Sequence, residues 1–160
     1  MQIRAAGKAD WQAVLAIIAP VLAAGETYAV ARDLDAEAVL AYWFSPSHEV
    51  FVAEEDGAIL GTYYLVANRQ GGGAHVANCG YITAAAAQGK GVARAMGEHS
   101  LARARERGFR AMQFNHVVST NERAVALWQK LGFAIVGTLP QAFNHPTQGY
   151  VDAYVMFRDL

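Results

Sequence analysis

A glycine-rich loop between a predicted strand and a predicted helix is the strongest chemical signal in this sequence. Residues 88–93 read Gln-Gly-Lys-Gly-Val-Ala, after a strand-like segment at 75–83 and before a helix-like segment at 92–107. Backbone N–H groups at a helix N-terminus lack intrahelical partners, and the helix dipole adds positive potential. Because Gly89 and Gly91 carry no Cβ, a phosphate can approach this backbone closely. The loop therefore predicts a phosphate-binding site.

Two common phosphate-binding motifs do not fit this loop. A P-loop places Ser or Thr after its lysine to hold magnesium, whereas Gly91 follows Lys90. A dinucleotide fingerprint needs a third small residue, and Arg94 stands at that place. The pattern that fits is Gln/Arg-x-x-Gly-x-Gly/Ala, met by Gln88, Gly91 and Ala93. Because glycine-rich loops also occur as plain strand-to-helix turns, the loop alone leaves a structural role open.

Composition limits the class of protein. The 160 residues predict a single domain over 1–160, and 13 Lys and Arg against 14 Asp and Glu argue against a nucleic-acid or membrane-surface protein. No apolar run has the length of a membrane span, and the N-terminus lacks a signal-peptide pattern. The single cysteine, Cys79, excludes an intramolecular disulfide and suits a cytoplasmic location.

Hydrophobic periodicity and turn residues predict an α/β fold with the element order β-α-α-β-β-β-α-β-α-β-β. The expected architecture is one mixed sheet of about seven strands flanked by about four helices. Asp10, Asp35 and Thr120 are expected helix caps, Pro20 is expected near the end of the first helix, and Asp56-Gly57 is an expected hairpin turn. The predicted strands are 1–5, 50–54, 59–66, 74–83, 111–118, 133–138 and 150–157.

A second motif lies one predicted strand beyond the loop. Residues 121–133 follow the pattern Asn-x-x-Ala-x-x-Leu-x-x-x-x-Gly-Phe. With the loop at 88–93, this chain resembles the GCN5-related N-acetyltransferase (GNAT) family along essentially its whole length. The resemblance implies that the loop holds the pyrophosphate of acetyl-CoA as cosubstrate, and that a backbone N–H of strand residues 82–84 polarises the thioester carbonyl. The implied coenzyme contacts are Ile82, Thr83, Ala84, Gln88, Gly89, Lys90, Gly91, Val92, Ala93, Asn121 and Trp128.

Trp128 departs from the family pattern, which often has a tyrosine there that protonates the departing thiolate. An indole N–H donates a hydrogen bond but is not a usable acid. Trp128 is therefore expected to shape the pocket, and the thiolate to leave without a side-chain acid, unless Tyr81, Tyr150 or Tyr154 supplies one. The family's usual glutamate base is also absent, because no Asp or Glu lies between 58 and 97.

The remaining candidates for a base are Glu26, His75 and His116, or a chain of waters. A satisfied structural role is an alternative for each histidine. Glu26 belongs to the segment 26–28, where the family builds its acceptor side, and its carboxylate could pair with a substrate ammonium. A solvated loop is the alternative for this segment. Residues 143–146 are expected on a loop that could wall the same pocket.

A narrower resemblance involves two asparagines in apolar strands, Asn78 and Asn115. With Asn121, they are similar in spacing to asparagines of the fungal N-acetyltransferases that detoxify proline analogues such as azetidine-2-carboxylate. This resemblance implies substrate contacts for Asn78, Asn115, Tyr28 and Tyr81. The alternative is that the two amides pair with each other or with a strand edge. Cys79 should point to the opposite face from Asn78 and fill the core.

The sequence as a whole predicts an acetyl-CoA-dependent N-acetyltransferase for a small amine, with Glu26, His116 and Asn78 as candidate catalytic residues and a role in detoxification. The alternatives are an acetyltransferase for protein N-termini or lysines, and a non-catalytic acyl-CoA-binding module. No metal is expected, because the histidines lack metal-ligand spacing. Neither nucleic acid nor membrane is an expected partner. Homodimers through late strands are common in the family, although residues 151–157 equally fit an interior strand.

Overall fold

Strands and helices follow one another in the predicted order, in a computed structural model that describes residues 1–160. No helix is long and apolar enough to cross a membrane. The strands are β1 (Gln2–Ala5), β2 (Glu49–Glu55), β3 (Ala58–Ala67), β4 (Val76–Thr83), β5 (Ala111–Val118), β6 (Ala134–His145) and β7 (Gly149–Asp159). The helices are α1 (Trp11–Ala24), α2 (Ala36–Trp43), α3 (Val92–Glu106) and α4 (Glu122–Lys130).

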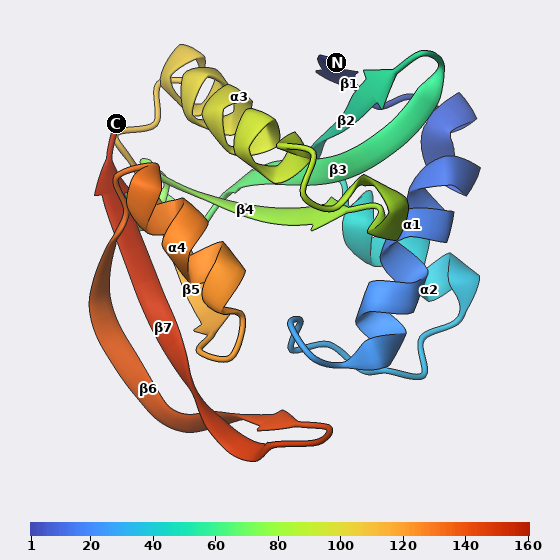
Figure 1. Ribbon diagram of the computed structural model, residues 1–160. Helices are drawn as coiled ribbons and strands as arrows, with labels where there is room; N and C mark the ends of the chain where they lie inside the picture. Colours follow the sequence, from blue (N-terminus) through green and yellow to red (C-terminus); the bar gives the residue numbers. More distant parts are fainter.

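The seven strands form one mixed sheet in the order β1-β2-β3-β4-β5-β7-β6, which confirms the predicted α/β architecture. β7 lies between β5 and β6 and is an interior strand. Every neighbouring pair is antiparallel except β4 and β5, which are parallel and pair only at Val76–Ala111 and Ala77–Met112. Beyond these pairs the two strands diverge and leave a wedge-shaped opening in the sheet (Figure 1).

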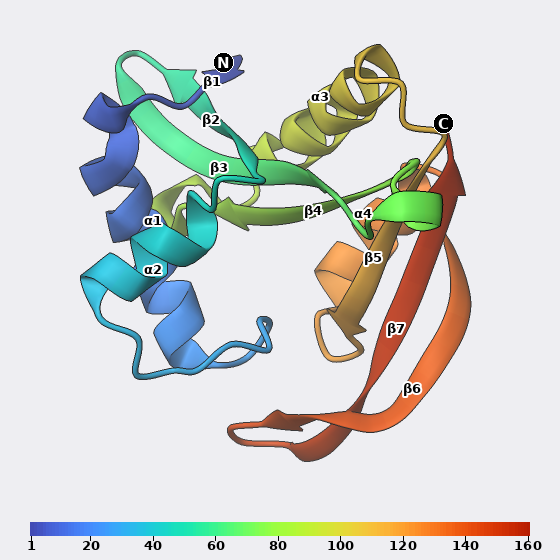
Figure 2. The same ribbon diagram turned by 180° about the vertical axis from the view of Figure 1, so that it is seen from behind.

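The two faces of the sheet carry separate apolar cores because side chains alternate along each strand. α3 and α4 pack on one face, in a cluster that includes Met96, Phe114 and Trp128. α1 and α2 pack on the other face, around Trp43 and other buried side chains (Figure 2). Cys79 lies in the first cluster, as predicted, and burial raises the pKa of its thiol to about 12.

Several local signals have the predicted effect. The Asp35 carboxylate accepts a hydrogen bond from the Ala38 backbone N–H at 2.8 Å and caps α2. Asp56 and Gly57 have φ values of 51° and 78°, as a tight hairpin between β2 and β3 requires. Gly108, with φ 81°, follows the end of α3. These residues act through neighbours in the sequence, which explains why they could be predicted.

Two helix boundaries and one cap differ from the prediction. Asp10 is the N-cap residue of α1, as predicted, but its side chain makes no capping hydrogen bond, because its carboxylate accepts hydrogen bonds from the guanidinium of Arg4 and the backbone N–H of Gly7. Pro20 lies inside α1, which continues to Ala24. A proline there removes one backbone donor, while apolar packing on both sides of it holds the helix. α4 begins after Asn121 rather than Thr120.

The last hairpin is longer than predicted. Residues 143–145 lie within β6 instead of a loop, and pair with β7 through Phe143–Val151, Asn144–Tyr150 and His145–Gly149. β6 continues past Pro140 because a register shift between Leu139 and Phe143 absorbs the irregularity on this edge strand. These residues therefore support the hairpin and do not line the cavity described below.

Candidate active site

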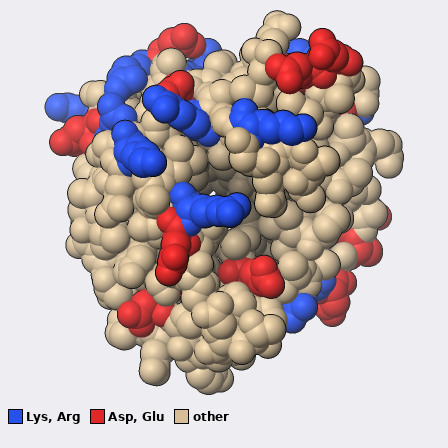
Figure 3. Space-filling view, in the orientation of Figure 1, with Lys and Arg blue, Asp and Glu red and all other residues tan.

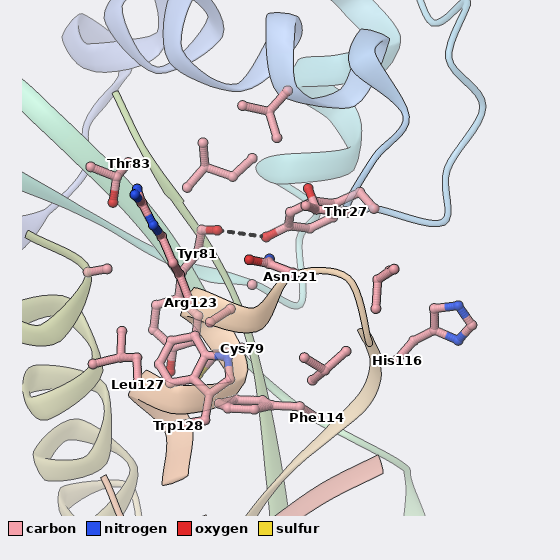
Figure 4. Close-up of a pocket in the computed structure, with 18 of the residues that line it drawn as sticks. Thr27, Cys79, Tyr81, Thr83, Phe114, His116, Asn121, Arg123, Leu127 and Trp128 are labelled. Carbon is pink, nitrogen blue, oxygen red and sulfur yellow. Dashed lines mark hydrogen bonds between the residues drawn. The ribbon is translucent and has the colours of Figure 1, made fainter. Parts of the chain in front are cut away.

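A cavity of about 880 Å³ lies in the opening where β4 and β5 diverge. Its walls come from the second half of β4, the loop before α3, the first turns of α4, the end of β5, and the segment after α1 (Figure 4). The sheet opens at this point because parallel pairing stops after two residue pairs. The cavity therefore joins the predicted phosphate loop to the predicted acceptor side.

The loop before α3 presents backbone N–H groups to one end of the cavity. Gly89 and Gly91 both have φ 78°, and a Cβ at either position would meet no protein atom within 4 Å. The first backbone hydrogen bond of the helix runs from Ala95 N–H to the Gly91 carbonyl, so the N–H groups of residues 92–94 precede it. This geometry fits a pyrophosphate, since the donors converge at the positive end of a helix dipole.

α4 and its N-cap residue contribute three polar or aromatic groups to the cavity. Asn121 is the N-cap residue, but its side chain makes no capping hydrogen bond and points into the cavity (Figure 4). Trp128 packs on Tyr81 and Phe114, with ring centroids 4.7 and 4.9 Å apart. Arg123 extends toward Thr83 at the end of β4 (Figure 4). This side of the cavity can therefore contact an extended ligand along its length.

The charges in the cavity are cationic. Its lining contains Arg94 and Arg123 but no Asp or Glu. Arg94 forms an ion pair with Glu98 at 2.8 Å, whereas Arg123 forms none. A space-filling view shows a Lys or Arg side chain across a hollow in this face and others above it (Figure 3). The arrangement favours anionic ligands and offers no carboxylate to a substrate ammonium.

Tyrosines and amides line the other end of the cavity, under α1 and α2. The Tyr28 hydroxyl donates a hydrogen bond to the Tyr81 carbonyl at 3.0 Å and ties the segment after α1 to β4. The hydroxyls of Tyr42 and Tyr64 are 3.4 Å apart. Burial raises the pKa of Tyr28 and Tyr64 far above that of a free phenol, so both are neutral donors. We call this end, lined by Tyr28, Tyr42, Tyr64, Asn78 and Asn115, the acceptor chamber.

The two predicted asparagines both line the acceptor chamber but do not pair with each other. The Asn78 side-chain oxygen accepts a hydrogen bond from the Cys79 backbone N–H at 2.8 Å. Asn115 donates to the Asn68 side chain and accepts from the Gln113 side chain. Both Nδ2 hydrogens of Asn78 and one of Asn115 remain unused, so the chamber keeps amide donors for a ligand.

Of the three predicted bases, the structure brings only His116 to the cavity. Glu26 is exposed and does not line it, because the chain turns at Gly25, with φ 67°, and directs Tyr28 inward instead. His75 is exposed at the start of β4. Burial lowers the pKa of His116, and its Nε2 atom is buried without a partner. Its ring points away from Tyr81 and Trp128 (Figure 4).

Some predicted coenzyme contacts and acids lie outside the cavity. Lys90 and Ala84 do not line it, and the Ala84 backbone N–H already donates to the Leu60 carbonyl at 2.8 Å. Tyr150 and Tyr154 do not reach it. Tyr81 does, but its hydroxyl is 2.7 Å from the Ser100 hydroxyl, and burial raises its pKa well above the ordinary value. None of these tyrosines is placed to protonate a thiolate.

Other lining residues were not predicted. In the sequence, Tyr42 and Tyr64 occupy ordinary apolar positions of a helix and a strand. Only the packing of α2 on the sheet brings them to the chamber. Arg123 lies in the second motif, two residues after Asn121. Its charge and this position could have predicted that it lines the cavity. No three or more His, Cys, Asp or Glu side chains gather in a way that could hold a metal ion.

Comparison with known proteins agrees with this geometry. Residues 15–133 match the model of the acetyltransferase (GNAT) family. The chain is 32% identical over 114 residues to N-acetyltransferase aca1 of Schizosaccharomyces pombe. That alignment covers 69% of this chain and 54% of the relative, so the chain spans about half the length of that curated protein.

Two solved structures extend the similarity to the whole fold. A GCN5-related N-acetyltransferase from Kribbella flavida is 47% identical, with a TM-score of 0.95 over 99% of this chain and 97% of the other. The yncA protein of Salmonella typhimurium, solved with its cofactor acetyl-CoA, is 26% identical, with a TM-score of 0.87 over 100% of this chain and 94% of the other.

Proposed function

Because the chain belongs to the acetyltransferase (GNAT) family, we propose that it transfers the acetyl group of acetyl-CoA to the nitrogen of a small amino acid or analogue. The observation that carries the proposal is one continuous cavity, with a phosphate-type loop at one end and a tyrosine- and amide-lined chamber at the other. Such a cavity can hold a thioester and an amine side by side, which lowers the barrier to their reaction.

The residues of the loop and of α4 fit acetyl-CoA, which supplies the activated acetyl group. The N–H groups of residues 92–94 and the open surface at Gly89 and Gly91 suit its pyrophosphate. Asn121 and Trp128 line the path toward β4. The backbone N–H of Thr83 is the proposed donor to the thioester carbonyl, since Thr83 lines the cavity and its N–H points to the opening. The Ala84 N–H bonds β3, and the Ile82 N–H, two positions earlier on the strand, points the same way.

The amine must be neutral to attack, and the cavity offers no carboxylate to deprotonate it. His116 is the lining side chain that titrates nearest neutral pH, but its ring is turned away from Tyr81 and Trp128 (Figure 4). The acceptor therefore loses its proton to water. We expect kcat/KM for the acceptor to rise with pH up to the pKa of the acceptor's own ammonium group. A His116→Gln variant should keep this pH profile. If kcat/KM of the variant no longer rose with pH in this way, His116 would instead be identified as the base.

The choice of a small amino acid is supported by the acceptor chamber. Asn78 and Asn115 supply amide donors that suit a carboxylate, no Asp or Glu lines the cavity, and Tyr42 and Tyr64 offer apolar surface to a compact side chain or ring. The similarity to a fungal N-acetyltransferase agrees with the resemblance to enzymes that act on proline analogues. The proposal includes a cytoplasmic, detoxifying role, with which the unpaired Cys79 is compatible.

The test is release of CoA thiol from acetyl-CoA with a panel of amino acids, azetidine-2-carboxylate, polyamines and N-terminal peptides. Release with a small amino acid supports the proposal. Release only with peptides favours a protein acetyltransferase, the kind of activity that a 26% identical protein, the ribosomal-protein-alanine N-acetyltransferase of Brucella melitensis, carries in its name. Binding of acetyl-CoA with no release on any amine favours a binding module.

Asn115→Ala measures the acceptor site directly. We expect it to raise KM for the acceptor by about tenfold or more and to leave KM for acetyl-CoA nearly unchanged, because a lost hydrogen bond to a charged group costs about 1.5–3 kcal/mol. The exposed Asn144, which lies outside the cavity, is the matched control for an asparagine-to-alanine change. Equal increases in both constants would mean that Asn115 has only a structural role.

A further inference from the structure

The Asn115 side chain is held on both sides by other amides. Its Nδ2 donates a hydrogen bond to Asn68 Oδ1 at 2.7 Å, and its Oδ1 accepts one from Gln113 Nε2 at 2.9 Å. We call Gln113, Asn115 and Asn68 the amide relay. Asn115 lines the cavity, whereas Asn68 and Gln113 do not. The two outer amides can therefore reach a ligand only through Asn115.

The relay lies where the sheet loses its backbone pairing. β4 and β5 pair last at Ala77–Met112, and the register of β5 with β7 shifts between Phe114 and Val117, which brackets Asn115. Asn68 directly follows β3, and its backbone N–H donates to the Val76 carbonyl at 2.8 Å. The Asn115–Asn68 bond thus links β5 to the β3–β4 hairpin, where the backbone ladder no longer does so.

In this arrangement the two hydrogen bonds give the Asn115 amide one polarity. Asn115 uses one N–H and one lone pair of its oxygen, which leaves one N–H and one lone pair for a ligand. If the amide turned over, the free N–H and the free oxygen would exchange places. An anionic ligand group that met a donor in the first orientation would meet an oxygen in the second, and it would bind less tightly.

We propose that Asn68 and Gln113 are positioning residues for the acceptor, because they hold Asn115 with its free N–H directed at the acceptor's carboxylate. This inference rests on the proposed function and deepens it, since it assigns the amino acid's carboxylate, rather than its ammonium, as the group recognised there. The lining agrees with this assignment, because it offers amide donors at the chamber and contains no Asp or Glu.

Two isosteric variants separate the effect of turning the Asn115 amide over from the effect of adding a negative charge. In Asn68→Asp the new carboxylate can still accept from Asn115 Nδ2, so the relay keeps its direction. In Gln113→Glu the new carboxylate cannot donate to Asn115 Oδ1, so the Asn115 amide must turn over, and Asn68 with it. Both variants add one negative charge near the chamber, and each is therefore the charge control for the other.

Steady-state kinetics with a small amino acid is the first readout. We expect Gln113→Glu to raise KM for the acceptor by about tenfold to a hundredfold relative to Asn68→Asp, the range expected for one hydrogen bond to a charged group. KM for acetyl-CoA should stay within about twofold of the wild-type value in both variants. Equal acceptor KM values in the two variants, or acetyl-CoA KM values that rise in step, would overturn the proposal.

The side-chain amide signal of Asn115 in a ¹⁵N-labelled protein is the second readout, and it needs no acceptor. The relay predicts that the Asn115 Nδ2 protons lie beside residue 68 in the wild type and in Asn68→Asp, and beside residue 113 in Gln113→Glu, which nuclear Overhauser contacts from the signal distinguish. Contacts with the same neighbour in both variants overturn the relay. If the wild-type protein acetylates no amino acid, both the proposed function and the carboxylate assignment fail. The amide signal still decides whether the relay orients Asn115.

Discussion

Gly80→Ala is a sensitive test of how the acceptor chamber is built. Gly80 lies on β4 directly beneath the ring of Tyr64, and a Cβ there would be 2.5 Å from Tyr64 Cε1 and 2.7 Å from Cζ. Carbon atoms in contact lie about 3.5–4.0 Å apart, so the ring must retreat by about 1 Å. His48 stacks on Tyr64 with centroids 4.0 Å apart, and the edge of Trp43 packs against it at 5.0 Å.

Because the Tyr64 ring is confined by its neighbours, the added methyl group acts as overpacking, which costs about 1–3 kcal/mol. For a domain of this size each kcal/mol lowers Tm by about 2–4 °C, so we expect a decrease of about 2–12 °C. KM for the acceptor should also rise, since Tyr64 lines the chamber, while KM for acetyl-CoA should change little. Thermal unfolding and steady-state kinetics measure the two effects.

Two further variants identify the cause. Gly72→Ala is the matched control, because a Cβ there meets no atom within 4 Å, and we expect no measurable change. In a Tyr64→Ala background the cost of Gly80→Ala should disappear, since the ring that the methyl group strikes is gone. If the two substitutions are instead additive in the free energy of unfolding, the contact between Gly80 and Tyr64 does not limit the packing, and the reasoning is wrong.

Three other predictions test the coenzyme end of the cavity and the pH dependence of stability. Gly91→Glu should abolish the rise in Tm that acetyl-CoA causes, whereas Gly108→Glu should keep it, because both glycines have positive φ (78° and 81°) in open space but only Gly91 lines the cavity. Trp128→Phe should change kcat by less than about threefold, because no acid is lost. A decrease of about a hundredfold, as expected for loss of a general acid, would contradict this. The pKa of His116 is lowered from 6.5 by burial, so the unfolded state binds the proton first as pH falls below that value. The free energy of unfolding should therefore decrease from neutral pH to about pH 5, and less steeply in His116→Gln, as measured by urea unfolding.

The conformation of the glycine-rich loop and the position of the second motif could be predicted because their geometry is local. Gly89 and Gly91 adopt positive φ, and α4 is capped one residue after the predicted Thr120, through interactions with residues a few positions away. Alternation along β4 likewise separates Asn78 from Cys79 wherever the strand is placed in the sheet. Strand and helix order follow from the same short-range patterns, which is why the predicted topology class agrees with the structure.

The acceptor chamber could be predicted only in part. The sequence singles out Asn78 and Asn115 because amides are unusual in apolar strands, but it does not indicate what holds them. Asn68 is 47 positions away from its partner Asn115. Tyr42 reaches Tyr64 only because α2 packs over β3. Contacts of this kind depend on how helices and strands pack against one another. The periodicity of the local sequence does not indicate which elements will be neighbours.

The sequence determined which elements form and where a phosphate-type loop meets a helix, since propensity, glycine conformation and hydrophobic period act over a few residues. The tertiary structure decided which candidates share a cavity. It brought His116 and the two asparagines to the opening between β4 and β5, left Glu26 in solvent, and added Arg123 and the amide relay. The physical reason is the early end of β4–β5 pairing, a long-range property of the sheet that selects the side chains facing the cavity.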